Sequence, residues 1–282
     1  MPTLSILLLL LLTFCSCKEN SPNDSRVSYG DNIKSGKYFN IRGFEMYVET
    51  YGDGQPLLLI HGNGGSMKQF ASQIPFFEKK YKVIVADSRA QGKSQDNGDS
   101  LSYEMMADDY AALLDAMNID SAFVTGWSDG GINGLLLAIR HPQKVKKLVA
   151  ASANLWPDST AMQNVFFELT WPAYTDLKRK EVRTDAEKRE WKLTRMMVEE
   201  PHIALSDINK IMCPSLIIAG DHDVIKEEHT ILIYKNIPKA YLWILPNSGH
   251  STLVAYKDDF NKTVDNFLSK PYREIIGNER LH

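Results

Sequence analysis

Cysteine is scarce in this chain. Only three of its 282 residues are cysteine, and two of these, Cys15 and Cys17, lie within the first twenty residues. The remainder of the chain therefore holds Cys213 alone, and a single cysteine cannot form an internal disulfide. A disulfide-stapled fold is excluded for the part of the chain after Cys17, and we expect Cys213 to be a small residue of the core.

Clusters of basic residues are also absent. The chain holds 32 Lys and Arg against 35 Asp and Glu, a net charge of −3, and the basic residues are scattered. A nucleic-acid-binding surface needs basic side chains gathered on one face, so we expect no nucleic-acid partner. With 282 residues, 44% of them hydrophobic, the chain can form one globular domain with a large core.

No lysine or arginine precedes the apolar run at the start of the sequence. Residues 6–12 read ILLLLLL, too short a run to span a bilayer, and Cys15, Ser16, Cys17 and a polar KENSPNDS follow. This order resembles the cleavage region of bacterial lipoprotein signals. We predict a signal peptide over residues 1–17, acylation at Cys17 with Cys15 as the alternative, and an exported cell-envelope protein that touches the membrane only through its lipid anchor.

The missing basic residues keep two other interpretations open. An ordinary secretory signal would give a secreted or periplasmic protein, and a buried amino-terminal helix would give no anchor. If acylation occurs, we expect more than one acyl chain, since a single chain gives only marginal membrane binding. Residues 18–36 are rich in Ser, Asn, Asp and Gly, which predicts a flexible tether.

Beyond residue 36, short apolar runs alternate with segments of helical periodicity. The runs cover residues 57–61, 82–87, 122–127, 146–151, 215–220 and 241–245. Unbroken runs of this kind are typical of strands covered on both faces. Between two of them, Met106, Tyr110 and Leu113 recur at helical spacing. The alternation predicts an α/β fold, with a mostly parallel central sheet and helices on both faces.

Residues 155–206 interrupt this alternation. They hold no strand candidate and read as a helical cap inserted into the core, which then comprises residues 37–154 and 207–272. Their large aromatic side chains exceed what a solvated connector would carry, so we expect them to line the substrate pocket. The alternative is that they pin the cap to the core. These residues are Trp156, Phe166, Phe167 and Trp171.

Residues 126–131 read GWSDGG and join a strand candidate to a helical segment. Gly126 and Gly130 flank Ser128 in the pattern G-x-S-x-G, which allows a sharp turn that lifts the hydroxyl clear of the sheet. The turn also places Ser128 at a helix N-terminus, where free N–H groups stabilise negative charge. Ser128 is our candidate nucleophile, although the short pattern alone also fits a glycine-rich turn with no catalytic role.

A serine nucleophile needs a base, and the base needs a partner that orients it. His250 follows the last strand candidate in LPNSGHST, and Asp221 and Asp223 follow the preceding one in AGDHDV. Since ligands collect at the carboxyl ends of parallel strands, Ser128, His250 and one of these carboxylates should converge on one edge of the sheet. The histidines that we expect at the surface instead are His222 and His229.

The loop HGNGGS, residues 61–66, follows the strand candidate LLLI. It lacks the spacing and the lysine of a phosphate-binding loop. We expect it to supply half of an oxyanion hole, with one backbone N–H from Asn63 and the other from Asp129, the residue after the nucleophile. We also place Trp127 and the Asp129 side chain among the substrate-binding residues.

Five motifs occur in one order: HGNGGS, VADSRAQGKS, GWSDGG, GDHD and GH. In this order, and over about residues 40–270, the sequence resembles the α/β-hydrolase superfamily with a short helical cap. The resemblance implies a Ser-His-Asp hydrolase that needs no cofactor or metal. It selects Asp223 over Asp221, because in similar proteins the carboxylate usually stands three residues after the glycine.

The resemblance has one departure, at Ala90, where members commonly show glycine; this puts the shape of that loop in doubt. We expect the neighbouring Arg89 to be a structural ion-pair partner. The implied reaction is hydrolysis of small carboxylic esters or related acyl compounds through an acyl-enzyme. Carbon-carbon bond hydrolases, lactonases, aminopeptidases and perhydrolases use the same triad and remain alternatives, and a catalytically idle binding lipoprotein is the non-enzymatic one.

The GWSDGG elbow is also similar to that of a superfamily member that cleaves amino-acid esters. In that member the acidic residue beside the nucleophile helps to bind the amino group of the substrate, and Asp129 holds that position here. A buried charge without a partner is costly. We therefore expect a cation beside Asp129, supplied either by Arg89 or Lys93 or by the substrate.

Overall fold

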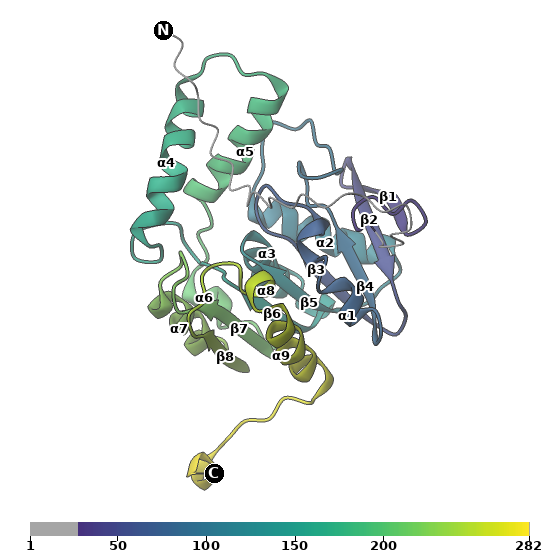
Figure 1. Cartoon of the computed structure of the whole chain (residues 1–282), viewed down its shortest axis with the longest axis vertical. Coiled ribbons are helices and arrows are strands. Elements are labelled where there is room, and N and C mark those ends of the chain that lie inside the picture. Colours follow the sequence, from purple (N-terminus) through teal and green to yellow (C-terminus); the bar gives the residue numbers. More distant parts are fainter. Residues whose placement is uncertain (1–27, 282) are drawn as a thin grey trace, which may run out of the picture.

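The computed structural model describes residues 28–281, which form an eight-stranded sheet flanked by helices (Figure 1). The sheet order is β1-β2-β4-β3-β5-β6-β7-β8, and pairing is parallel from β4 to β8 and antiparallel between β1, β2 and β4. The predicted fold class is confirmed. The strands are β1 Gly36–Ile41, β2 Phe44–Tyr51, β3 Gln55–Ile60, β4 Tyr81–Ala86, β5 Ala122–Trp127, β6 Val145–Ala151, β7 Ser215–Gly220 and β8 Ala240–Leu245.

Both faces of the central strands are buried, because apolar side chains alternate between two core clusters. Leu58 and Ile60 of β3 belong to one cluster with residues of the helices over 103–116 and 129–140. Leu57 and Leu59 belong to the other with residues of the helices over 67–70, 74–77 and 257–269. All four are fully buried. An unbroken apolar run is what a strand with two covered faces requires.

The helices lie on the two faces of the sheet and in one insertion. Figure 1 shows α8, α9 and α1 in front of the strands and α4 and α5 standing beyond the sheet. The helices are η1 Met67–Phe70, α1 Ile74–Phe77, α2 Tyr103–Ala116, α3 Asp129–Arg140, η2 Pro142–Lys144, α4 Asn164–Arg179, α5 Asp185–Glu199, α6 Leu205–Ile208, α7 Glu227–Asn236, α8 Thr252–Ala255, α9 Lys257–Ser269 and η3 Gly277–Leu281. Among the described residues, no helix combines the length and the apolar character that crossing a bilayer requires.

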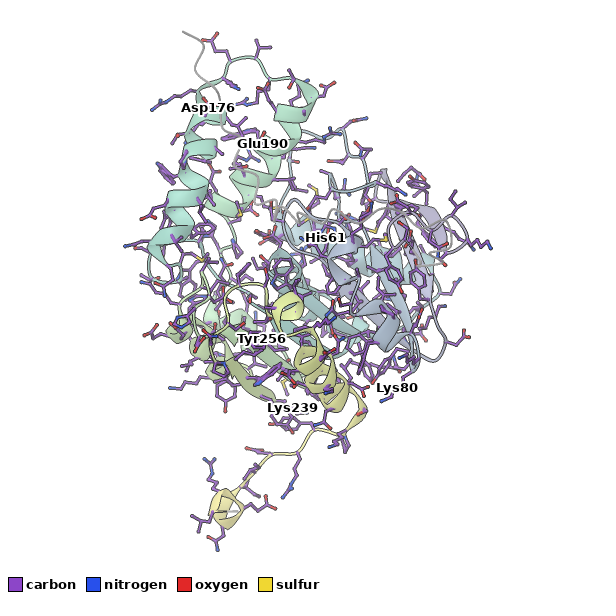
Figure 2. All side chains as sticks on the ribbon, in the orientation of Figure 1. His61, Lys80, Asp176, Glu190, Lys239 and Tyr256 are labelled. Carbon is purple, nitrogen blue, oxygen red and sulfur yellow. The ribbon has the colours of Figure 1, made fainter. Side chains whose placement is uncertain are left out.

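The insertion, residues 155–206, folds as a hairpin of α4 and α5. The Trp171 ring lies tilted against Tyr174, with ring centroids 5.3 Å apart, and Tyr174 stacks on Trp191 of α5 at 5.5 Å. Figure 2 places Asp176 and Glu190 on these two helices. The aromatic stack therefore holds the two cap helices together.

A buried lysine fastens the cap to the core. Lys192 of α5 is 6% exposed and donates to the Asp96 carboxylate at 3.1 Å and to the Gly98 carbonyl at 2.7 Å. The same carboxylate accepts from Arg89 at 3.1 Å. This ion network joins α5 to the loop that follows β4.

The first part of the described chain corrects one sequence prediction. The N–H groups of Gly30 and Asn32 donate to the buried Glu49 carboxylate at 2.8 and 2.9 Å. Residues 28–36 are thus held against the sheet, although the sequence predicts a flexible tether over 18–36. The predicted signal peptide, with Cys15 and Cys17, lies outside the described residues.

Candidate active site

Ser128 lies in the turn between β5 and α3, with φ 57° and ψ −123°. A Cβ at Gly126 would lie 1.9 Å from the Gly130 carbonyl oxygen, and one at Gly130 would lie 1.9 Å from the Ile60 carbonyl oxygen. Only glycine fits at either position. The two glycines allow the helix to start directly against the sheet, which forces Ser128 into its strained conformation.

Three predicted residues meet at the carboxyl ends of β5, β7 and β8. The Nε2 atom of His250 lies 2.9 Å from Ser128 Oγ, and its Nδ1 atom lies 2.7 Å from Asp223 Oδ1. Since an ionised carboxylate can only accept, the proton of neutral His250 lies on Nδ1 and Nε2 is free to accept from the serine hydroxyl. This geometry allows proton transfer from Ser128 to His250.

The Asp223 carboxylate is buried and accepts hydrogen bonds at both of its oxygens. Burial alone would raise its pKa, but the His250 charge and hydrogen bonds from His250, Ser152 and the Ile225 N–H bring the pKa below the usual value. Asp223 therefore stays ionised beside the imidazole. Asp221 instead accepts from the N–H groups of Asn247 and Ser248 at 2.9 Å, so it braces the turn before His250.

His250 is held from both sides. Burial lowers its pKa, but the Asp223 charge and hydrogen bond and the Asp129 charge together raise the pKa above 6.5. Trp127 donates through Nε1 to the His250 carbonyl at 2.8 Å, and its ring centroid lies 5.4 Å from the imidazole. Trp127, which the sequence predicts to bind substrate, thus supports His250.

The loop after β3 lies directly against the nucleophile. A Cβ at Gly62 would be 3.1 Å from Ser128 Cβ, so the loop backbone approaches Ser128 closely. His61, near the centre of the molecule in Figure 2, is buried; it bonds the Gly62 carbonyl through Nδ1 at 2.8 Å and accepts the Ser88 N–H through Nε2 at 2.9 Å. Because burial lowers the His61 pKa, it serves as a neutral brace for this loop.

The Asp129 side chain follows Ser128, the candidate nucleophile, and is only 4% exposed. Its Oδ1 accepts from Tyr103 Oη at 2.9 Å, and its Oδ2 accepts from Asn63 Nδ2 at 2.8 Å. Burial raises the Asp129 pKa to about 6, although these two hydrogen bonds and the charge of His250 lower it. The carboxylate is therefore held by neutral donors.

Arg89 and Lys93, the protein cations that the sequence offered for Asp129, are bound elsewhere, so the protein half of that expectation is wrong. Arg89 donates to both Asp109 oxygens at 2.7 and 2.8 Å and stacks over Phe44, as expected for a structural ion-pair partner. Lys93 lies 3.0 Å from the exposed Asp31. The intervening Ala90 has φ 62°, a conformation that favours glycine and costs alanine about 1–2 kcal/mol.

The Asn63 side chain also reaches the cap. Its Nδ2 group donates to the Leu193 carbonyl of α5 at 3.3 Å in addition to Asp129. The Asn63 amide thus joins three parts of the molecule: the loop after β3, which is expected to hold the oxyanion, Asp129, and the cap helix α5.

The predicted pocket aromatics have different surroundings. Phe166 and Phe167 contact each other edge to face at 5.3 Å, and Phe166 is buried in a cluster with Met162 and Ile225. Trp171 is half exposed in the stack that joins the cap helices. Trp156 meets the edge of His229 at 4.7 Å.

Two expectations about other side chains change. His229 is buried rather than at the surface, since its Nε2 accepts the Leu155 N–H at 2.9 Å, and burial lowers its pKa to about 4. Cys213 is partly buried at the edge of the core.

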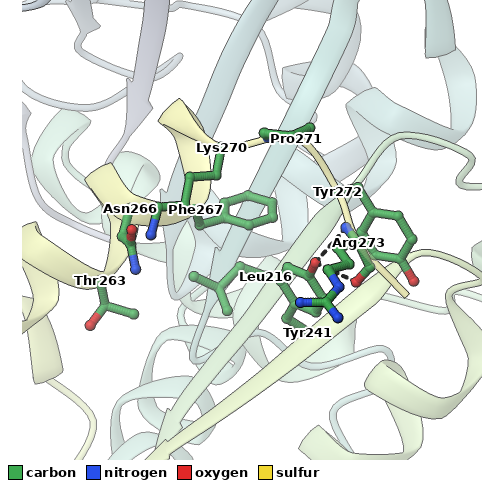
Figure 3. Close-up of a pocket in the computed structure, with 9 residues that line it drawn as sticks. All are labelled: Leu216, Tyr241, Thr263, Asn266, Phe267, Lys270, Pro271, Tyr272 and Arg273. Carbon is green, nitrogen blue, oxygen red and sulfur yellow. Dashed lines mark hydrogen bonds between the residues drawn. The ribbon is translucent and has the colours of Figure 1, made fainter. Parts of the chain in front are cut away.

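A cavity of about 430 Å³ opens elsewhere, below the chain that follows α9. Figure 3 shows Tyr241 and Phe267 in its wall, with the Tyr241 hydroxyl bonded to the backbone of Arg273. Leu216 and Tyr241 are second residues of β7 and β8, so this cavity lies at the opposite strand ends from Ser128. Within residues 28–281, no group of three or more His, Cys, Asp or Glu side chains is arranged to hold a metal ion.

Sequence reasoning missed Ser152, Tyr103 and the Asn63 side chain. Each reaches its partner across a long stretch of sequence: Ser152 and Asp223 are 71 residues apart, and Asn63 and Asp129 are 66 apart. Ser152 directly follows β6, and this strand-end position was the signal that could have found it.

Comparison with known proteins agrees with this geometry. A model of the alpha/beta hydrolase fold family matches residues 55–206. The human serine hydrolase BPHL (valacyclovir hydrolase) is 26% identical over an alignment of 265 residues, and the match covers 86% of this chain and 88% of that protein. A putative carbamate hydrolase RutD of Caulobacter is 28% identical over an alignment of 256 residues, and the match covers 79% of this chain and 96% of that protein. The enol-lactonase structure from Burkholderia xenovorans superposes with a TM-score of 0.72 at 19% identity, over 83% of this chain and all of that one. This chain belongs to the α/β-hydrolase family.

Proposed function

We propose that the protein is a serine hydrolase that cleaves small carboxylic esters or related acyl compounds. The observation that carries the proposal is the continuous hydrogen-bonded relay from Ser128 through His250 to Asp223. Two further features support the proposal. The strained turn exposes the Ser128 hydroxyl for attack on a carbonyl, and the glycine loop brings backbone N–H groups close enough to stabilise the resulting anion.

In the proposed reaction Ser128 Oγ attacks the carbonyl carbon while His250 Nε2 takes its proton. The N–H groups of Asp129 and Asn63 stabilise the oxyanion, and Asp223 stabilises the imidazolium. His250 then protonates the leaving alcohol, which departs and leaves an acyl-enzyme. Water, deprotonated by His250, attacks the acyl group, and the proton returns to Ser128 as the acid is released.

Covalent labelling tests the proposal without knowledge of the natural substrate. A fluorophosphonate or phenylmethylsulfonyl fluoride should label Ser128 stoichiometrically in the wild-type protein, and peptide mass mapping should locate the adduct. Denatured protein and Ser128→Ala are the controls. The relative kcat/KM values for a panel of esters, lactones, amides and substrates of carbon-carbon bond hydrolases then show which reaction the protein prefers. Absence of an adduct at Ser128 would leave the idle binding protein as the better interpretation.

One observation favours a narrower substrate class, the amino-acid esters. Among the described residues, the recorded hydrogen bonds to the Asp129 carboxylate come from the neutral Tyr103 and Asn63, and Arg89 and Lys93 are paired elsewhere. Burying an unneutralised carboxylate is costly, and an ammonium group on the substrate would offset that cost. The likeness to valacyclovir hydrolase supports the same assignment.

The pH dependence of hydrolysis should distinguish the two classes. The His250 pKa is raised above 6.5, and His250 must be neutral to act as base, so kcat/KM should fall with decreasing pH for every ester. Asp129 is protonated as the pH falls through about 6, which removes the partner of a substrate ammonium. A plot of log kcat/KM against pH should therefore approach a slope of two below pH 6 for an amino-acid ester. For its N-acetyl form the slope should approach one. Equal slopes in wild type would contradict the amine-binding role.

We also propose that the protein is exported and anchored by acyl chains on Cys17, on the strength of the apolar run ending in CSC. Intact mass of protein extracted from membranes should show loss of the residues before Cys17 and the added mass of its acyl groups. Cys17→Ser should release the protein from the membrane fraction, whereas Cys15→Ser should not. An uncleaved amino terminus, or a free one beyond Cys17, would refute the anchor.

A further inference from the structure

Ser152 lies immediately after β6, inside the site but outside the predicted triad. It is 1% exposed and has φ 53°, a left-handed conformation that favours glycine. Its N–H donates to the Ile218 carbonyl at 2.8 Å, which continues the pairing of β6 with β7. A buried, strained serine at the end of a central strand calls for an interaction that offsets the strain.

The Ser152 hydroxyl supplies such an interaction. Its Oγ lies 2.6 Å from Asp223 Oδ2 and 3.2 Å from the His250 carbonyl oxygen. The hydroxyl has a single proton, and the shorter contact, to a charged acceptor, takes it. The other oxygen, Oδ1, accepts from His250 Nδ1 and from the Ile225 N–H. Within residues 28–281, Ser152 is thus the recorded donor to Oδ2.

We propose that Ser152 is a positioning residue for catalysis, which fixes the orientation of the Asp223 carboxylate and disperses part of its charge. This inference rests on the proposed function. With Oδ2 held by Ser152, the carboxylate cannot rotate, and Oδ1 stays aimed at His250 Nδ1. The hydroxyl also weakens the attraction between Asp223 and the imidazolium. A carboxylate that accepts a second hydrogen bond carries less free negative charge and is a weaker base.

Two substitutions separate the hydroxyl from the backbone strain. Ser152→Gly removes the hydroxyl and fits the positive φ, whereas Ser152→Ala removes the hydroxyl and keeps the strain. We expect both variants to react with a fluorophosphonate about tenfold more slowly than wild type, since each loses one hydrogen bond to a charged group. The glycine variant should be the more stable of the two in urea unfolding.

The charge effect is measured on His250 itself by NMR titration of its ring, a readout that needs no turnover. The charged groups facing this imidazole are Asp223 and Asp129. Without the Ser152 hydrogen bond, Asp223 should hold the imidazolium more strongly, so the His250 pKa should rise in both variants, and the acid limb of kcat/KM should move to higher pH with it.

The outcomes are separable from those of the proposed function. An unchanged or lowered His250 pKa in both variants, or a loss confined to Ser152→Ala while Ser152→Gly behaves as wild type, would overturn the positioning role. Failure of wild-type Ser128 to form any adduct would overturn the proposed function, and the NMR titration would still report whether Ser152 acts on the Asp223–His250 pair.

Discussion

Ser128→Ala is expected to lower kcat by about 10⁴- to 10⁶-fold, and His250→Ala should lower it as much, because nucleophile and base act as one unit. The 2.9 Å contact between Ser128 Oγ and His250 Nε2 is the physical reason. Asp223→Asn should cost about 10³- to 10⁴-fold, since the amide no longer fixes the tautomer of His250. Turnover of the best ester in the panel, corrected for active-site concentration, measures all three.

Asp221→Asn is the matched control for the acid. Asp221 lies two residues before Asp223 and braces the turn through the N–H groups of Asn247 and Ser248. Its substitution should lower stability but leave most of the turnover. Full activity in Asp223→Asn together with a large loss in Asp221→Asn would show that the acid has been assigned to the wrong residue.

Asp129→Asn is expected to make the protein more stable and less selective. The folded-state pKa of this acid is raised from 3.8 to about 6, so its ionisation opposes folding at every pH above that value. Asparagine should therefore increase the free energy of unfolding by about 1–3 kcal/mol at pH 8, and the gain should disappear as the pH falls from 6 to 4. Urea unfolding at several pH values measures it.

The same variant should lose the preference for a free amino group. A buried hydrogen bond to a charged group is worth about 1.5–3 kcal/mol, so the ratio of kcat/KM for an amino-acid ester to that for its N-acetyl form should fall by about ten- to a hundredfold. If the wild-type protein hydrolysed the amino-acid ester and its N-acetyl form with equal kcat/KM, the amine-binding role would be wrong and Asp129 would be a structural residue.

Asp109→Asn should lower the free energy of unfolding, whereas Asp129→Asn should raise it, so this variant controls for the effect of burial alone. Asp109 is as deeply buried as Asp129 and burial raises its pKa as well, but its two oxygens accept from Arg89, which lowers that pKa. Its neutralisation would leave a buried guanidinium without its main partner, which costs about 3–5 kcal/mol. If both variants lost stability equally, the interpretation of Asp129 as an uncompensated charge would be wrong.

The parts of the fold that the sequence predicts are those whose pattern is local. The runs that become β3 to β8 are apolar on both faces, and the elbow is defined by glycines within six residues. β1 and β2 were missed, because Tyr38 of β1 is 55% exposed and the buried Glu49 of β2 breaks the apolar pattern. An antiparallel edge carries a weaker signal than a central strand.

The meeting of Ser128, His250 and Asp223 could be anticipated because each of them follows its own strand, so the topology of a parallel sheet brings them together. The surroundings of Asp129 could not. Both Tyr103 and the Asn63 side chain reach this carboxylate from other loops, whereas the basic residues nearest in the motif, Arg89 and Lys93, have other acidic partners. Sequence proximity to a motif does not decide which buried polar groups meet.

The glycines of the elbow also determine where this site can change. A methyl group at position 126 or 130 would sit 1.9 Å from a backbone oxygen, so both positions are closed to mutation. Position 129 is open, because the proposed reaction needs only its backbone N–H, which every residue except proline provides. A lineage or an engineer could therefore exchange the side chain beside the nucleophile and alter the range of accepted esters, while the machinery that breaks the bond stays as it is.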